Sequence, residues 1–356
     1  MRVLLTGHRG YIGTVMTPML LDAGHEVVGL DTELYETCTF GDGQDIVDVP
    51  SIRKDIRDVT TEDLADFEAV VHLAALSNDP LGDLNPALTD EINHRASVRL
   101  ARLAKEAGVE RFIFSSSCSN YGAAGEDWLT ENSPLNPVTP YGESKVAVEQ
   151  AVSALADEAF CPTFPRSGTA YGVSPRLRFD LVLNNLTAWA YTTGQVFLKS
   201  DGRALRPIVH IEDISRAFLA ILHAPKDVVR NGVFNIGTTT ENYRVSELAE
   251  IVASVVPGSR IEYADGAGPD KRNYRVDCNR LARTLPDYKP QWTARRGAEE
   301  LYEAFQRIGI TVDDFEGPRF KRIAHVKLLM EEGRLTDRLR WTKAQEVAGA
   351  ASRASE

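Results

Sequence analysis

The chain has 356 residues, 43% of them apolar and 26% charged, which is typical of a globular protein with one large or two moderate cores. Its 40 basic and 51 acidic residues give a net charge of -11 without a Lys/Arg block, which argues against nucleic acid as a partner. Four cysteines without a CxxC pair indicate free thiols and no metal site, and the lack of a signal-peptide pattern or an 18-residue apolar run predicts a cytoplasmic protein without a membrane partner.

The first half of the chain alternates short apolar runs with longer helical patterns. Five runs are expected to form strands, at residues 2–6, 25–31, 69–75, 111–117 and 161–167. Between them, apolar residues at three- and four-residue spacing predict helices over 11–23, 86–107 and 140–158. Strands separated by helices predict an α/β fold whose doubly wound parallel sheet is covered on both faces.

After residue 168 the pattern becomes less regular. We expect a helix within 176–194, further helices over 213–223 and 245–255, and a strand over 232–237. The chain is therefore divided into a first domain over 1–168, a smaller mixed α/β lobe over 169–311 and a helical tail over 312–356, with a return to the first domain around 206–240. In the tail, 321–341 is charged and amphipathic and predicts a solvated helix packed on the body, while the Ala/Ser-rich end is expected to fray.

A glycine-rich turn follows the first strand in the sequence TGHRGYIG, with Gly7, Gly10 and Gly13 at the entrance to a helix. Such a turn lets the backbone approach a pyrophosphate and directs unpaired N–H groups at it, as in Rossmann-type dinucleotide sites. Asp31, at the end of the second strand, would bind the ribose hydroxyls of NAD and repel the 2′-phosphate of NADP. The alternatives are that these residues only shape the turn, and that Arg9 meets a phosphate and favours NADP.

The sequence PYGESK places Tyr141 and Lys145 four residues apart, just after Pro140 at the start of a helix. Residues at this spacing share one helix face, so the ammonium group is expected to favour the phenolate and make Tyr141 a general base. Ser117, at the carboxyl end of its strand, would hydrogen-bond the substrate oxygen. Taken singly, a YxxxK pattern can arise by chance and a serine cluster is usually a loop.

Together with KDIRD (54–58), HLAA (72–75) and RPIVHIED (206–213), these motifs resemble the extended short-chain dehydrogenase/reductases that act on nucleotide sugars, over roughly residues 1–310. The resemblance implies a catalytic triad of Ser117, Tyr141 and Lys145, and a homodimer packed through the helices near 86–107 and 140–158. It also implies cofactor contacts at Gly7, Arg9, Gly10, Tyr11, Ile12, Gly13, Asp31, Asp55, Ile56, Leu73, Ala74, Ala75, Tyr141 and Lys145.

The two residues after Ser117 bear on the reaction. In nucleotide-sugar 4,6-dehydratases of this family an acid pair stands there, whereas this chain has Cys118 and Ser119, which are poor general acids near neutral pH. We therefore predict an NAD-dependent nucleotide-sugar epimerase. The alternatives are a ketoreductase using NAD(P)H, a 4,6-dehydratase, and a nucleotide-binding module without turnover.

The substrate contacts are less clearly indicated. The predicted set is Ser77, Asn78, Ser117, Ser119, Thr169, Asn184, Asn185, Arg206 and Arg272. Arg206 and Arg272 lie near positions where family members hold the diphosphate, and Thr169 stands where relatives often have asparagine. For each of these residues the alternative is a structural or surface role, and His210 is expected to be a buried structural histidine.

Overall fold

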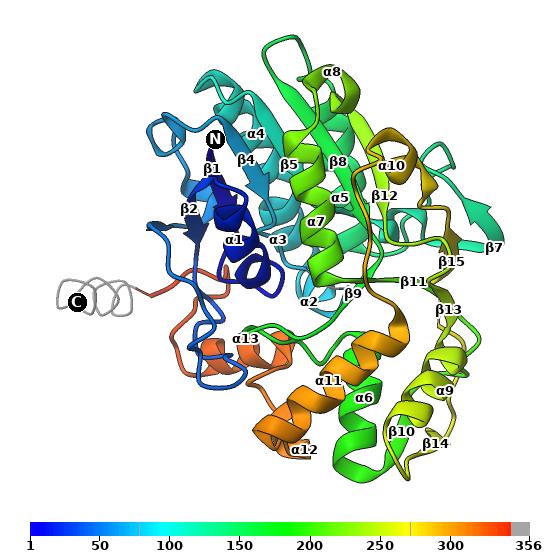
Figure 1. The fold of residues 1–356 in the computed structure, drawn as a ribbon. Coiled ribbons are helices and arrows are strands. Elements are labelled where there is room, and N and C mark those ends of the chain that lie inside the picture. The colour runs from blue at the N-terminus through cyan, green and yellow to red at the C-terminus, as the bar shows by residue number, and fades with distance from the viewer. Residues whose placement is uncertain (78, 271, 343–356) are drawn as a thin grey trace.

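The computed structural model describes residues 1–77, 79–270 and 272–342. Within them, eight parallel strands form a central sheet in the order β12-β8-β5-β4-β1-β2-β3, with β6 paired to β8 (Figure 1). The strands are β1 Arg2–Thr6, β2 Glu26–Asp31, β3 Ser51–Arg53, β4 Ala69–His72, β5 Arg111–Phe114, β6 Ser116–Ser117, β8 Cys161–Ser167 and β12 Gly232–Ile236. This sheet confirms the predicted doubly wound α/β fold.

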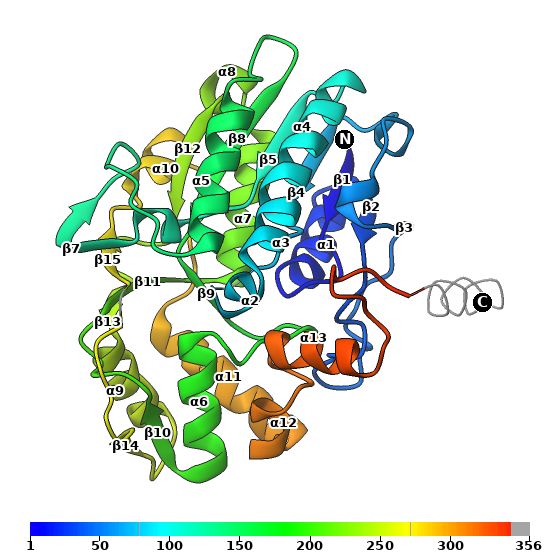
Figure 2. The same ribbon diagram turned by 180° about the vertical axis from the view of Figure 1, so that it is seen from behind.

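Helices cover both faces of the sheet, because successive side chains of a buried strand point to opposite sides. Val3 and Leu5 pack with α1 (Gly13–Asp22) and α7 (Ile211–His223), which lie in front of the sheet in Figure 1. Leu4 packs on the other face with α4 and α5, which lie in front in Figure 2. The helices and helical turns on this side are α2 Asp79–Leu84, α3 Pro86–Thr89, the π-helical η3 Asp90–Ala96, α4 Ser97–Glu106 and α5 Pro140–Ser153.

The second lobe packs around α6 (Val182–Thr193), α9 (Val245–Val255) and α11 (Ala294–Ile308). The strands outside the central sheet are β7 Ala123–Leu129, β9 Thr169–Tyr171, β10 Gln195–Leu198, β11 Leu205–His210, β13 Asn242–Arg244, β14 Arg260–Tyr263 and β15 Asn273–Val276. The remaining helices are α8 Lys226–Val229, α10 Asn279–Thr284, α12 Val312–Glu316 and α13 Arg322–Glu331. Across the described ranges, no helix is both long and apolar enough to cross a membrane.

The sheet register brings several strand ends to one level. Thr6 is paired with Leu30 and with His72, and His72 is paired with Phe114. The loops that begin at Gly7, Leu73 and Ser115 therefore leave the sheet along the same carboxyl edge, which is where ligands bind in open parallel sheets.

The structure corrects the limits of several expected elements. The run 111–117 is interrupted at Ser115, so that β5 and β6 are separate strands. The helix expected over 86–107 has a π-helical middle, and the helix expected over 140–158 ends at Ser153. The tail helix covers only Arg322–Glu331.

A buried ion pair ties α5 to the sheet. Glu149 on α5 and Arg166 on β8 are 6% and 4% exposed, and their charged groups approach to 2.5 Å. The Glu149 carboxylate also accepts hydrogen bonds from Ser116 and from Asn120 Nδ2, the latter at 2.9 Å. Glu149 lies one helical turn after Lys145, so this network sets how the tyrosine and lysine of the same helix stand against the strands.

This network predicts a specific mutational pattern. We expect Arg166→Met to lower the free energy of unfolding by about 3–5 kcal/mol, because it leaves the Glu149 carboxylate buried without its cation. The double variant Arg166→Met/Glu149→Met should recover most of that loss, since no uncompensated charge remains. Denaturant unfolding of both variants measures the effect. A double variant as unstable as the single one would contradict it.

Candidate active site

One cavity of about 1000 Å³ lies at the carboxyl edge of the main sheet, between the sheet and the second lobe. It brings together most of the residues predicted from the sequence. From the predicted cofactor set, those lining it are Gly7, Gly10, Tyr11, Ile12, Gly13, Asp31, Asp55, Ile56, Leu73, Ala74, Ala75, Tyr141 and Lys145. From the predicted substrate set, they are Ser77, Ser117, Ser119, Thr169, Asn185, Arg206 and Arg272.

Two predicted contacts lie elsewhere, and a third falls outside the described residues. Arg9 is not among the residues that line the cavity, and its guanidinium pairs with Asp48 at 2.7 Å. Asn184 is fully buried and hydrogen-bonds the Tyr11 hydroxyl at 3.1 Å, so it holds the second lobe against the glycine turn instead of facing a ligand. Asn78 lies outside the described residues.

The glycine turn requires residues without a side chain. Gly7 has a φ of +76°, and a Cβ there would come within 2.9 Å of the Ala74 backbone nitrogen. A Cβ on Gly13 would come within 2.3 Å of the Gly7 carbonyl oxygen. No side chain caps the amino end of α1 and no acidic residue stands in its first turn. The N–H groups of Thr14 and Val15 bond to carbonyls of the turn itself, and glycines at the cavity wall leave the helix amino end open to the pyrophosphate of a dinucleotide.

Asp31 stands at the end of β2, beside the glycine turn. Its carboxylate oxygens accept backbone hydrogen bonds from Arg9 at 3.1 Å and from Glu33 at 2.8 Å. Burial raises the pKa of Asp31, although these two hydrogen bonds oppose the shift. A carboxylate held in this way fits the hydroxyl groups of a ribose better than a phosphate.

Ser117, Tyr141 and Lys145 meet at the carboxyl end of β5 and β6. The Ser117 hydroxyl donates to Ser119 Oγ at 3.0 Å, and Ser117 is close enough to the Tyr141 phenol to lower its pKa. Lys145 Nζ donates to the Ser115 carbonyl at 2.7 Å and lies 5.6 Å from the centre of the Tyr141 ring. The predicted serine, tyrosine and lysine thus form one cluster, and the interruption of the strand at Ser115 supplies the carbonyl that orients the lysine.

The charges in this cluster differ from the sequence-based expectation. Burial raises the pKa of Tyr141 to about 12, with Asp79 adding to the shift and Ser117 opposing it. Burial lowers the pKa of Lys145 to about 7, against the influence of Glu149. The expected acidification of the phenol is therefore wrong for the chain alone, because desolvation of the phenol has the largest effect on its pKa and Asp79 acts in the same direction.

The two positions after Ser117 carry no strong acid. Cys118 is 1% exposed, its thiol donates to the Arg166 carbonyl at 3.2 Å, and burial raises its pKa above the usual range. Ser119 lines the cavity. Asp79, the first residue of α2, brings a carboxylate to the same cavity, and Arg272 binds it at 2.6 Å.

A chain of charges connects the second lobe to the helix of Tyr141. Arg206 pairs with Asp270 at 2.6 Å, and Asp270 pairs with Arg272 at 3.1 Å. Arg272 pairs with Asp79, whose other oxygen accepts from the Thr139 hydroxyl at 2.7 Å. Thr139 caps the amino end of α5. An anionic ligand that takes Arg206 and Arg272 would therefore change the surroundings of Asp79 and of the catalytic helix.

Several residues that line the cavity were not predicted from the sequence. Arg178 and Asp180 form a two-bond ion pair at 2.9 and 3.0 Å, and Arg178 also donates to Ser77 Oγ at 3.1 Å. Asp79 follows the HLAA motif within a few residues, so the end of β4 could have indicated it. Further examples are Tyr274 and, from the tail, Lys321, Arg322, Ile323 and Leu339, for which the sequence carries no ligand-binding motif.

Comparison with known proteins places the chain in a family. The model of the NAD dependent epimerase/dehydratase family matches residues 3–237, which is more than half of the chain. The chain belongs to this family. The match ends at the strand β12, so it leaves out most of the second lobe and the tail.

Relatives that span nearly the whole chain agree with this placement. The UDP-glucose 4-epimerase of Lactobacillus helveticus is 30% identical over 317 residues, or 82% of this chain and 92% of the relative. The solved structure of MoeE5 in complex with UDP-glucuronic acid and NAD is 28% identical, covers 86% of this chain and 99% of its own, and has a TM-score of 0.74. The Thermus thermophilus UDP-glucose 4-epimerase in complex with NAD is 25% identical over 86% and 99% of the two chains, with a TM-score of 0.72.

The lowered pKa of Lys145 predicts a pH-dependent stability. In the unfolded chain the amine has a pKa near 10.5 and in the folded chain about 7, so burial of the ammonium destabilises the fold fully below pH 7 and progressively less as the pH rises toward 10.5. In ligand-free protein, Lys145→Met should therefore gain most in stability relative to the parent below pH 7, and lose that gain at alkaline pH.

Thermal unfolding across this pH range measures the difference between variant and parent. Lys327→Met, on the surface of α13, controls for the general effect of removing a lysine. A difference that does not change with pH would contradict the burial of a neutral amine.

Proposed function

We propose that the chain is an NAD-dependent nucleotide-sugar epimerase, which oxidises one sugar hydroxyl to a ketone and returns the hydride to the opposite face. The observation that carries the proposal is a single cavity that joins the glycine turn and Asp31 to Ser117, Tyr141 and Lys145. Membership of the NAD dependent epimerase/dehydratase family supports it. So does the similarity to UDP-glucose 4-epimerases.

The cofactor proposal is NAD, with NADP as the weaker alternative. The uncapped amino end of α1 would hold the pyrophosphate, Asp31 the adenosine ribose, and Leu73 to Ala75 the adjoining wall. Bound NAD would supply the acceptor and later the donor of a hydride. Arg9 is paired with the exposed carboxylate of Asp48, so the preference for NAD rests on Asp31 and not on this pair.

Side chains of α5 and β6 carry out the proposed proton transfer. Tyr141 takes the proton from the sugar hydroxyl, while Ser117 hydrogen-bonds the same oxygen. Because burial keeps Tyr141 protonated in the chain alone, we propose that ligand binding makes the phenolate accessible by adding hydrogen bonds and positive charge. Lys145, anchored on the Ser115 carbonyl, holds the nicotinamide ribose.

The proposed substrate is a nucleoside diphosphate sugar. Arg206 and Arg272 line the cavity together with Asn185 and with the amino end of α6, which no side chain caps. Two guanidinium groups and an uncapped helix suit a diphosphate. Both arginines are paired with Asp270, so binding of a diphosphate would exchange one set of ion pairs for another. The homodimer implied by the family resemblance is also part of this proposal.

A dehydratase is the second candidate, because Asp79 lines the cavity and acts on the pKa of Tyr141. We favour the epimerase, because Cys118 and Ser119 occupy the positions of the dehydratase acid pair. Loss of water from the sugar, seen as a change in product mass, separates the two reactions.

The proposal predicts the effect of removing one hydroxyl. Tyr141→Phe should lower kcat by about 10²–10⁴-fold, the usual contribution of a positioned acid–base group, while the purified protein keeps its bound NAD. Turnover is measured by nuclear magnetic resonance on UDP-, GDP-, CDP- and dTDP-sugars without added cofactor. The matched control is Tyr302→Phe, on α11 outside the cavity.

Two outcomes would contradict this proposal. Unchanged turnover in Tyr141→Phe would remove the catalytic assignment. A parent enzyme that turns over only with added NAD(P)H, and consumes it, would instead be a ketoreductase.

A further inference from the structure

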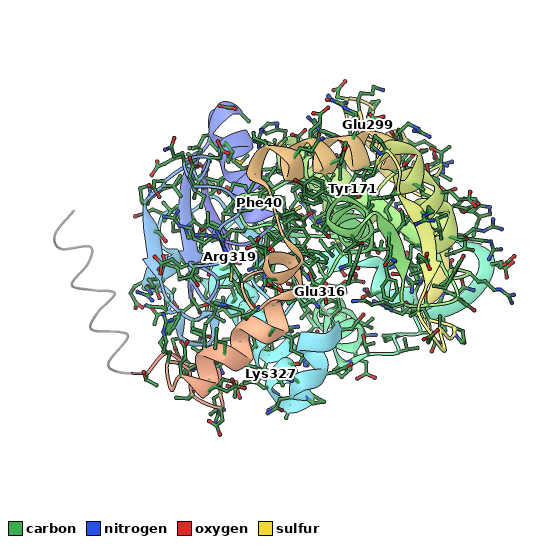
Figure 3. The ribbon with its side chains drawn as sticks, turned by 90° about the horizontal axis from the view of Figure 1, so that it is seen from below. Phe40, Tyr171, Glu299, Glu316, Arg319 and Lys327 are labelled. Atoms are coloured by element: carbon green, nitrogen blue, oxygen red, sulfur yellow. The ribbon has the colours of Figure 1, made fainter. Side chains whose placement is uncertain are left out.

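The segment after α11 runs back over the cavity and connects both lobes. Phe315 and Phe320 are buried in the core of the second lobe with α6 and α11. Val326 and Leu329, on α13, are buried in the core of the first lobe. Figures 1 and 2 both show α13 between α6 and the carboxyl edge of the sheet, and Figure 3 shows from below how the chain from Arg319 to Lys327 crosses between the lobes.

The polar contacts of this segment go to the loops that follow β2 and β3. Trp341 Nε1 donates to the Thr32 carbonyl at 2.6 Å, and His325 Nε2 contacts the Leu34 carbonyl oxygen at 2.9 Å. These two carbonyls follow directly after Asp31, the residue proposed to hold the adenosine ribose. The segment is therefore bound to the backbone that carries the ribose site.

Two arginines near the end of the segment form ion pairs beside Asp55 and Ile56, which belong to the predicted cofactor contacts. Arg340 pairs with Asp58 and lies 3.9 Å from the carboxylate of Asp55. Arg338 pairs with Glu91 at 2.5 Å, and its carbonyl accepts from Arg57 Nη2 at 3.0 Å. Between them, Leu339 is 4% exposed and lines the cavity together with Ile56.

The segment also brings an uncompensated charge to the cavity wall. Arg322 is 3% exposed, lies 4.0 Å from the Tyr35 ring and donates to the Arg176 carbonyl at 2.9 Å. Within the described ranges, neither Arg322 nor the buried Arg176 has a carboxylate within 4.0 Å. Burial lowers the pKa of both guanidinium groups; repulsion by Arg322 adds to the shift of Arg176, and repulsion by Arg178 adds to that of Arg322. Unpaired buried cations are costly, and an anion nearby would offset that cost.

We propose that residues 321–341 form the outer wall of the dinucleotide site, with Leu339 against the adenosine and Arg322 supplying positive charge toward the phosphates. A bound dinucleotide then leaves only when this segment lifts from the sheet edge. The inference rests on the proposed binding of NAD. It assigns cofactor contacts to residues beyond the 3–237 matched by the family model.

The exchange rate of the dinucleotide tests the wall directly. Bound NAD is displaced by an excess of a fluorescent adenine-modified NAD, and its dissociation rate is measured. Arg338→Ala/Arg340→Ala removes both ion-pair anchors and leaves Leu339 and Arg322 in place. We expect dissociation to become about tenfold faster, equivalent to about 1.4 kcal/mol. The control Arg2→Ala/Arg244→Ala removes two exposed ion pairs, with Glu26 and Glu126, away from the cavity and should leave the rate unchanged.

Hydrogen exchange identifies which part of a ligand the segment contacts. ADP-ribose should protect the amides of 322–332, whereas nicotinamide mononucleotide and UDP should not. Arg322→Met should weaken ADP-ribose at least tenfold and leave the affinity for UDP unchanged, with thermal unfolding confirming that the variant is folded. Protection by UDP in place of ADP-ribose would assign the segment to the nucleotide sugar and overturn the proposal.

The outcomes separate this inference from the proposed function. Suppose that NAD binds, that Arg338→Ala/Arg340→Ala does not change its dissociation rate, and that ADP-ribose does not protect 322–332. The proposed wall is then overturned and the epimerase proposal stands. If no dinucleotide binds the parent protein, both are overturned together.

Discussion

The arrangement of the candidate active site depends on the hydrogen bond from Lys145 to the Ser115 carbonyl. This bond connects α5 to the point where the strand run 111–117 breaks, and so fixes Tyr141 and Ser117 relative to each other. One helical turn further on, the buried pair of Glu149 and Arg166 makes a second connection to the sheet. Both contacts bury charge, and burial of Lys145 lowers its pKa to about 7. The chain alone therefore carries an electrostatic cost at the place where we propose that ligands bind, as is common at functional sites.

The charges around the cavity suggest how the substrate is selected. The ion pairs of Arg206, Asp270, Arg272 and Asp79 form a chain of alternating charge. This chain leads from the second lobe to Thr139, which caps the catalytic helix. A neutral sugar offers no anion to compete with the two aspartates for the arginines, whereas a diphosphate does. On this account the diphosphate draws Arg272 away from Asp79, a carboxylate that raises the pKa of Tyr141. The diphosphate contacts therefore select a nucleotide sugar but do not favour the phenolate, which depends on Ser117 and on the bound cofactor.

Much of the first lobe could be predicted, because its apolar runs are long and regularly spaced. The strands at 2–6 and 161–167 have the expected limits, and so does one helix of the second lobe, at 245–255. Short strands of the second lobe, such as β9, β13 and β15, were not predicted, because three or four residues of mixed polarity carry no periodic signal. Their pairing across distant parts of the chain, as between β15 and β7, is set by tertiary packing.

The site shows the same division between local and distant information. The glycine turn and the YxxxK pattern are local, so the sequence indicated them. The pKa of Tyr141 depends instead on burial and on Asp79, about sixty residues away, and the sequence-based expectation had the wrong direction. Arg322 and Leu339 reach the cavity from the tail through contacts with the loop after β2, and no motif in 321–341 indicates a ligand.

The central claim is that one cavity unites proton transfer by Tyr141 with hydride transfer to a resident dinucleotide. The most direct measurement is the near-ultraviolet absorbance of reduced nicotinamide after the purified enzyme is mixed with a nucleotide sugar that it turns over, without added cofactor. The account predicts a signal that rises and decays within the time of turnover in the parent enzyme and does not rise in Tyr141→Phe. Turnover of the sugar by the parent enzyme with no reduced nicotinamide at any time would contradict it.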